Sequence, residues 1–327
     1  MIDYLSLIKN TSAYRTVKND KKAGRLSHAY LILTADKDKL LEYAKIFAKL
    51  SACESENPCG QCRACRLIEN SSHPDVIFYP QKSDSVTAED VNSLIEESFL
   101  KPIESDKKIF VILSAESMNL SAQNKLLKTL EEPPAGVHIL LLGTSEFSLL
   151  PTIKSRVKKL EIPAFSNDLL LDALSRDCPD TERLKWAVCC GDGTVGKALS
   201  LYGDQKLKEL SDFVEEIILN MQSSKDVLLY STKFSDIKAD VDDFLSVLEL
   251  YLRDMLVERQ GREDLAFNKS ECERLKKAQK FNTGAILYAL DAITEARKKK
   301  KFNMTATMLI EWLLFQILEG KYKWQKF

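Results

Sequence analysis

Four cysteines that could bind a metal ion lie close together, at Cys53, Cys59, Cys62 and Cys65. The last three are separated by two residues each, and a Pro-Cys-Gly sequence supplies a tight turn. Cys-x-x-Cys spacing lets two thiolates face one ion, and further thiolates nearby complete a tetrahedron. Four sulfur ligands with no open position indicate a structural zinc site. The alternative, a group of reduced thiols, is the weaker interpretation because the cluster is so dense.

A phosphate-binding loop is missing where it would be expected. In nucleotide-binding sheets the sequence G-x-x-x-x-G-K-[ST] follows the first strand, and its backbone N–H groups wrap the phosphates. Here the apolar run 29–34 is followed at 35–41 by Ala-Asp-Lys-Asp-Lys-Leu-Leu, which has no glycine. The carboxylates of Asp36 and Asp38 would repel phosphate. The sequence therefore predicts that this chain binds no ATP.

The acidic pair that would hold magnesium is also missing. A P-loop ATPase needs such carboxylates after a later strand. The apolar run 109–113 is followed by Ser114-Ala115, and Glu116 comes one place later. A single offset carboxylate is better interpreted as an acid at a helix start. We therefore expect no intrinsic ATPase activity.

The elements that would position these residues fall into three ranges. Up to residue 163, short apolar runs at 29–34, 75–79, 108–113 and 138–142 alternate with helical stretches, which predicts a parallel sheet covered on both faces. One helix is expected at 122–132, with Ser121 as its N-cap and two prolines after it. Residues 164–205 have helical periodicity and a glycine cluster, and 206–327 predict helices only. The expected fold class is α/β plus all-α.

The bulk composition limits the classes of function. The chain has 327 residues, 45% of them hydrophobic and 29% charged, with a net charge of −1. A protein that binds DNA strongly by itself usually carries a basic excess, because its affinity comes from neutralising phosphates. No signal peptide and no long apolar run is recognisable. We therefore expect a cytoplasmic protein with reduced cysteines.

Several sequence strings together resemble a known family. They are Ser-His-Ala-Tyr-Leu at 27–31, the cysteine cluster, Ala-Gln-Asn-Lys-Leu-Leu-Lys-Thr-Leu-Glu-Glu-Pro-Pro at 122–134, and Leu-Pro-Thr-Ile-Lys-Ser-Arg at 150–156. In this order and spacing they resemble the clamp-loader subunits of bacterial DNA polymerase III, closely over about the first 200 residues. The stretch 252–254 resembles the family's C-terminal collar.

The resemblance implies an architecture and a role. It implies an AAA+ RecA-like domain at 1–163 with a zinc module at 53–65, a helical lid at 164–205 and a helical collar for oligomerisation at 206–327. The family's gamma/tau subunits keep the phosphate loop, whereas its delta-prime subunits have a degenerate one, so this chain resembles the delta-prime type.

The family's Ser-Arg-Cys sequence supplies an arginine finger to the ATP site of an adjacent subunit. Ser155-Arg156-Val157 matches it here, with the cysteine replaced and the arginine kept. The resemblance thus implies a non-catalytic subunit of the DNA polymerase III holoenzyme. Its implied partners are gamma/tau and delta subunits, the sliding clamp and primer-template DNA. The interpretation of Arg156 without the resemblance is a surface arginine in a salt bridge.

Weaker candidates and two other functions stay open. Thr144 matches the family's sensor-1 position and Lys197 a nucleotide-sensing position, while the basic run 297–301 could contact phosphates or form a solvated helix end. A gamma/tau-like ATPase with a divergent nucleotide site is the first alternative, and ATP binding by the isolated chain would identify it. A zinc-dependent nucleic-acid-binding module is the second, which the near-neutral charge disfavours.

Overall fold

The computed structural model describes residues 2–81, 85–203, 206–237, 239–262, 281–300 and 304–323. The chain divides into two compact units. The first comprises residues 1–179 with 191–197, and the second comprises 180–190 with 198–327. The three domain ranges expected from the sequence stay predictions.

The first unit is built on a five-stranded sheet. Its strands are β1 (Ala29–Thr34), β2 (Val76–Tyr79), β3 (Lys108–Ile112), β4 (Val137–Gly143) and β5 (Lys158–Ile162). They lie in the order β2-β3-β4-β1-β5, and every neighbouring pair is parallel. The inner strands β1, β3 and β4 are almost continuously apolar and buried, as expected for strands covered on both faces.

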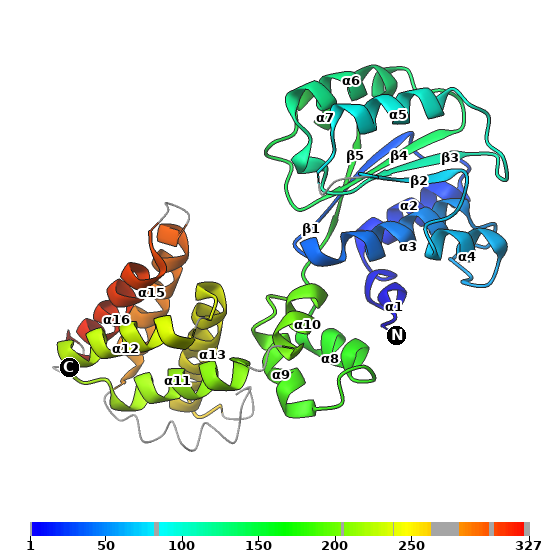
Figure 1. Cartoon of the computed structure of the whole chain (residues 1–327). Helices are drawn as coiled ribbons and strands as arrows, with labels where there is room; N and C mark the ends of the chain where they lie inside the picture. The colour runs from blue at the N-terminus through cyan, green and yellow to red at the C-terminus, as the bar shows by residue number, and fades with distance from the viewer. Residues whose placement is uncertain are drawn as a thin grey trace. The chain divides into compact units, whose positions relative to one another are not determined.

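Helices cover both faces of this sheet (Figure 1). One face carries α2 (Ser12–Lys22) and α3 (Leu40–Ala52), and the other carries α5 (Ala88–Ser98) and α6 (Leu120–Glu131). Short helices complete the unit: α1 (Tyr4–Ile8), α4 (Arg63–Glu69), α7 (Pro151–Lys154) and α8 (Asn167–Leu174). Because strand side chains alternate between faces, Leu31, Phe110 and Leu141 join the core that contains α5 and α6.

The sequence predicted four of the five strands. The missed strand, β5, has only Leu160 and Ile162 buried, while Lys158, Lys159 and Glu161 are exposed. Exposed charges are typical of an edge strand, and they hide its apolar pattern.

The expected N-cap of α6 was wrong. The cap is Asn119, whose Oδ1 accepts a hydrogen bond from the Ala122 backbone N–H at 2.9 Å. The helix therefore begins at Leu120, and Ser121 lies inside its first turn. Asparagine and serine cap helices equally well, so composition alone could not choose between them.

The parallel sheet separates two edges of the first unit. The carboxyl edge carries the segments after β1, β3 and β4, at 35–39, 113–117 and 144–147. The amino edge carries the segments before β1, β4 and β5, at 27–28, 131–136 and 155–157. The six residues of β1 hold these edges about 20 Å apart. Ligands of such sheets bind at the carboxyl edge, where neighbouring strands connect in opposite directions, here β1 and β4.

The second unit contains only helices among its described residues. They are α9 (Thr181–Cys189), the part of α10 (Val195–Gly203) from Ala198 onward, α11 (Lys206–Asn220), α12 (Ser224–Ile237), α13 (Val241–Arg259), α15 (Thr283–Lys300) and α16 (Ala306–Lys323). Aromatic side chains fill the core, and the rings of Phe234 and Phe244 lie 5.1 Å apart. The expected fold class, α/β plus all-α, is confirmed. None of the described helices is long and apolar enough to cross a membrane.

Candidate functional site

The four predicted metal ligands meet at one point of the first unit. The sulfur atoms of Cys53, Cys59, Cys62 and Cys65 all lie within 4.8 Å of one another. The distances from Cys53 Sγ to Cys59 Sγ and Cys62 Sγ are 3.7 and 3.9 Å, and Cys59 Sγ lies 4.0 Å from Cys65 Sγ. A zinc–sulfur bond of about 2.3 Å gives tetrahedral edges of about 3.8 Å. The cluster therefore has the dimensions of a four-sulfur tetrahedral site.

Two helix ends and a turn position these thiols. Cys53 follows the last residue of α3, and Cys62 is the N-cap of α4. Cys59 begins the turn, in which Gly60 has φ +70°, a conformation that favours glycine. The Cys59 sulfur accepts a hydrogen bond from the Cys62 N–H at 3.3 Å, and the Cys62 sulfur accepts one from the Cys65 N–H at 3.4 Å. These N–H···S contacts orient the sulfurs toward a common point.

Helix α2 supports the loop that carries the cluster. The Lys21 ammonium donates to the carbonyl oxygens of Cys53 and of Ser55, the latter at 2.7 Å. The Tyr14 hydroxyl donates to Asn57 Oδ1 at 3.1 Å. Burial lowers the pKa of Lys21, since it penalises the charged amine. The loop is thus fixed by polar contacts that do not depend on a metal.

The thiols of the cluster differ in how readily they lose a proton. Backbone hydrogen bonds, first from Cys62, lower the pKa of Cys59 to about 6. Burial raises the pKa of Cys65 to about 12. Four thiolates held this close together without a cation would repel one another, and a divalent ion removes that penalty. The donor set and the spacing therefore fit a metal ion that prefers sulfur.

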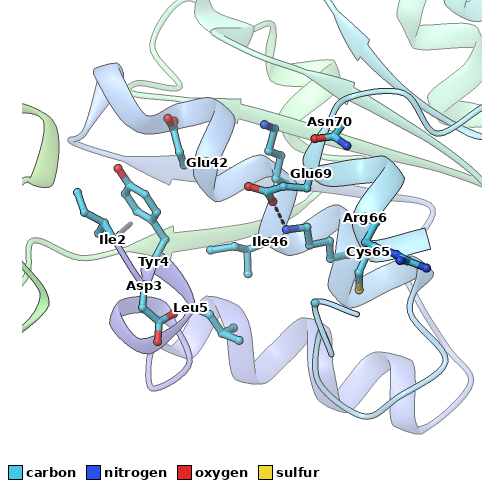
Figure 2. Close-up of a pocket in the computed structure, with 13 residues that line it drawn as sticks. Ile2, Asp3, Tyr4, Leu5, Glu42, Ile46, Cys65, Arg66, Glu69 and Asn70 are labelled. Carbon is cyan, nitrogen blue, oxygen red and sulfur yellow. Dashed lines mark hydrogen bonds and ion pairs between the residues drawn. The ribbon is translucent and has the colours of Figure 1, made fainter. Parts of the chain in front are cut away.

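A groove of about 590 Å³ lies beside the cluster, between α1, α3 and α4. Figure 2 shows Tyr4 and Leu5 on one side, Glu42 and Ile46 on α3, and Arg66 on α4. The lining mixes both signs of charge with apolar side chains. It has no excess of cations that would favour a nucleic acid.

Three basic side chains around the cysteine module are paired with acids. Arg63 binds Glu104 through two hydrogen bonds of 3.0 and 2.6 Å. Lys18 pairs with Glu56 at 3.2 Å, and Lys49 pairs with Glu69. Nucleic-acid binding needs cations available for phosphates. The surroundings of the module thus agree better with a structural role than with a zinc-dependent DNA-binding module.

At the carboxyl edge, Asp36 occupies the position after β1. Its side chain is only 3% exposed and accepts hydrogen bonds from the backbone N–H groups of Val195 and Gly196, at 2.8 and 3.1 Å, and from the Tyr43 hydroxyl at 2.9 Å. Burial raises the pKa of Asp36, and hydrogen bonds from Gly196, Tyr43 and Val195 offset part of that rise. A Cβ on Gly196 would lie 2.5 Å from Asp36 Oδ1, so only glycine fits there. The carboxylate therefore fills the anion position at the start of α10.

Glu116 is also committed to local contacts. Its Oε1 accepts hydrogen bonds from the Thr144 N–H and hydroxyl, at 3.0 and 2.6 Å. Its Oε2 is buried and has no hydrogen-bond partner among the described residues. A Cβ on Gly143 would lie 2.2 Å from this oxygen, so the site is closely packed. The carboxylate ties the end of β4 to the segment after β3, and Thr144, the expected sensor position, is its partner.

Arg156 lies at the opposite, amino edge. Its backbone carbonyl accepts a hydrogen bond from His28 Nε2 at 3.1 Å, and its backbone N–H donates to Ile153 at 2.9 Å. The guanidinium donates to Thr152 O at 2.9 Å and Ser155 Oγ at 3.2 Å, and it forms an ion pair of 2.8 Å with Glu131. Its side chain is 35% exposed. The residue thus faces away from the carboxyl edge of its own sheet.

The remaining sequence candidates are engaged in ion pairs. Lys197 Nζ lies 2.6 Å from Asp192 Oδ2. In the basic run, Arg297 pairs with Glu249, Lys298 with Glu295, and Lys300 with Asp240 and Asp242, while Lys299 lies over the Trp312 ring. Lys301 lies outside the described residues. The contacts agree with a paired, solvated helix end.

Sequence reasoning missed two contacts of these sites. It treated Asp36 only as a residue that repels phosphate, because its partners follow about 160 positions later. It did not find Glu131 as the partner of Arg156 either. Both residues occur at recognisable places, after a strand and at a helix end, but their partners are distant in sequence.

Comparison with known proteins gives one consistent result. A family model described as "DNA polymerase III, delta subunit" matches residues 9–166. The DNA polymerase III subunit delta' of Bacillus subtilis is 28% identical over 94% of both chains, and that of Pseudomonas aeruginosa is 27% identical over 89% of this chain and 91% of the relative. The tau subunit of Bacillus subtilis is 30% identical, but over 63% of this chain and 38% of the relative. The similarity to these two delta' subunits spans nearly the whole chain, and it agrees with the resemblance to DNA polymerase III clamp-loader subunits seen in the sequence.

Proposed function

We propose that this chain is a non-catalytic subunit of the DNA polymerase III clamp loader. It helps to assemble the loader with gamma/tau-type and delta-type subunits, and it supplies Arg156 to the ATP site of a neighbouring subunit. Through that complex it takes part in loading the sliding clamp on primer-template DNA during replication. The gamma/tau-type partners are proposed because tau and gamma subunits are similar to this chain, and the other partners are what the family resemblance implies. We expect this work to take place in the cytoplasm.

The observation that carries the proposal is the position of Arg156. The parallel sheet separates it from the carboxyl edge of its own unit by the length of β1, about 20 Å. A guanidinium acts on a phosphate through direct contact. Arg156 therefore cannot serve a nucleotide at the edge where its own fold would bind one, whereas it can serve a site on another subunit.

Three of the four sequence segments that carry the family resemblance contribute residues to one surface, the amino edge of the sheet. His28 from the first string, Glu131 from the third and Arg156 from the last meet at the amino edge through the His28 and Glu131 contacts to Arg156. His138 Nδ1 adds a hydrogen bond of 2.8 Å to the Ser27 carbonyl. The two histidine contacts hold the backbone that presents Arg156. A rigid support of this kind favours a role that needs accurate placement of one side chain.

The chemistry needs only a positive charge at the right place. Transfer of a phosphoryl group spreads negative charge over the γ-phosphate oxygens, and an arginine supplied in trans stabilises that charge. The guanidinium can donate to two oxygens at once. A subunit without an ATP site can thereby make a neighbour's hydrolysis depend on correct assembly. Ser155, whose Oγ accepts from Arg156, would help to orient the side chain.

The contacts at the carboxyl edge support the proposal that this chain binds no nucleotide itself. A phosphate at the start of α10 would have to displace Asp36, whose negative charge already accepts the helix N–H groups. The segment 35–41 has no glycine to wrap phosphates. Glu116 is bound to Thr144 and has no second carboxylate beside it in Ser114-Ala115. Each feature disfavours a gamma/tau-like ATPase with a divergent site.

Zinc is the proposed ion of the cysteine cluster. Four thiolates at tetrahedral spacing leave no open position for a substrate. Cys53, Cys59, Cys62 and Cys65 would hold the ion, which would cross-link the end of α3 to the start of α4. The role is structural, since the cluster lies on a different part of the unit from Arg156.

The proposal is tested in a loader reconstituted with the gamma/tau-type and delta-type subunits. Arg156→Ala should leave assembly intact and lower DNA-stimulated ATP hydrolysis, by up to about 10³-fold at the ATP site that the residue serves. Arg156→Lys should recover only part of the loss, because lysine keeps the charge but not the paired donors. Lys154→Ala removes a cation from the same short helix and should have no effect. An unchanged rate with Arg156→Ala would remove the proposed role.

A further inference from the structure

The Arg156 side chain is held in a folded-back position by its own subunit. Its Nη1 donates to the Thr152 carbonyl, four residues earlier, and to Ser155 Oγ, while its Nη2 pairs with Glu131. Of these partners only Glu131 is charged. In this position the guanidinium already has three partners within its own subunit.

Stability of the α6 helix does not explain Glu131. It is the last residue of that helix, and a negative charge there is unfavourable with the helix dipole. The adjacent Glu132 is exposed as well, and no ion pair to it occurs among the described residues. Two acids at one helix end are costly unless one has a cationic partner. Arg156 is that partner for Glu131.

The backbone and the side chain of Arg156 differ in how firmly they are fixed. The backbone is bound on both sides, by His28 and by the buried turn at Ile153. The ion pair, in contrast, is half exposed: the side chains of Arg156 and Glu131 are 35% and 48% exposed. Pairs of this kind change an equilibrium by about two- to fivefold. The carboxylate can therefore be displaced by a phosphate, which carries more charge and matches the guanidinium equally well.

We infer that Glu131 is a positioning residue that keeps Arg156 folded against its own subunit until a neighbour's phosphate competes for the guanidinium. This inference rests on the proposed function of Arg156 and adds a restraint to it. In partly assembled complexes the Glu131 ion pair thereby keeps Arg156 from binding a phosphate. The arginine side chain moves outward only when the ATP of the neighbouring subunit is close. The ligand that competes is a nucleoside triphosphate bound to another subunit.

The test compares Glu131→Gln, Glu132→Gln, Arg156→Ala and the double variant of Glu131 and Arg156 in the reconstituted loader. ATP hydrolysis is measured without and with primed DNA. Glu131→Gln should raise the rate without DNA about two- to fivefold, because the guanidinium is released more easily. Glu132→Gln should match the unaltered chain. The double variant should match Arg156→Ala alone.

The last comparison separates restraint from a structural role. A defect in α6 would persist in the absence of Arg156, whereas a restraint on Arg156 vanishes with it. A rate unchanged or lowered by Glu131→Gln would overturn the inference, as would an effect that survives in the double variant. If Arg156→Ala itself had no effect, the proposed function would fail first, and the two failures are thus distinguishable.

Discussion

Replacing Asp36 by alanine should loosen the start of α10. In the structure the Asp36 carboxylate accepts hydrogen bonds from the buried N–H groups of Val195 and Gly196 and from the Tyr43 hydroxyl. Asp36→Ala removes the acceptor and leaves the two N–H groups without a partner. Each buried N–H group left unpaired costs about 1–3 kcal/mol.

Part of this cost is offset. The pKa of Asp36 is raised by burial, so its ionised form is held in the fold at some expense. A raised pKa in the folded state means that the contribution of this carboxyl to stability is largest below its unfolded pKa and declines as pH rises through the folded pKa. At neutral pH we therefore expect a net loss of about 2–4 kcal/mol. With 1.4 kcal/mol for each factor of ten, this corresponds to a change of about 30- to 1,000-fold in the local opening equilibrium.

Hydrogen exchange followed by mass spectrometry measures this opening directly. Peptides that cover residues 192–200 should exchange faster in Asp36→Ala by about that factor. Asp38→Ala removes an exposed carboxylate from the same segment and serves as the matched control. Equal exchange in Asp36→Ala and the unaltered chain would refute the reasoning, and so would an equally large effect of Asp38→Ala.

Two other predictions concern the metal ion and the loss of folding stability at acid pH. The purified chain should contain one zinc ion, and Cys62→Ser should remove this ion together with part of the thermal stability of the first unit. Cys178 is a buried thiol outside the cluster, so Cys178→Ser should keep the zinc. Metal analysis and thermal melting measure both effects, and a metal-free chain with unchanged melting would contradict the prediction. Burial acts to raise the pKa of Asp75, but backbone N–H groups of residues 103–105 together lower it. Its stabilising contribution should therefore be present above the unfolded pKa of about 3.9 and be lost as pH falls through the folded value. Urea unfolding of the first unit should show Asp75→Asn to be less stable by about 2–4 kcal/mol at pH 7, with the difference shrinking toward pH 3.

Local patterns predicted the parts of the fold that depend on local chemistry. The inner strands β1, β3 and β4 are covered on both faces, so their apolar runs are nearly continuous. The cysteine cluster was recognisable because its ligands are neighbours in the sequence. The edge strand β5 was missed because solvent covers one of its sides and permits Lys158 and Lys159.

Long-range contacts could not be predicted in the same way. The Asp36 carboxylate and the N–H groups of α10 are about 160 positions apart in the sequence, so no local pattern pairs them. The pair of Glu131 and Arg156 requires that α6 ends at the edge where β5 begins. The position of Arg156 at the amino edge likewise follows from strand order, which the sequence does not state. Topology therefore supplied the argument that this arginine acts on another subunit.

The central claim is that this chain has no working ATP site and acts on the ATP of a neighbour. The most direct measurement is ATP turnover by the purified chain alone, with magnesium, in the presence and absence of primed DNA. We predict no turnover above background and no saturable ATP binding. Hydrolysis at about one ATP per second, within the range of ordinary enzymes, would contradict the claim.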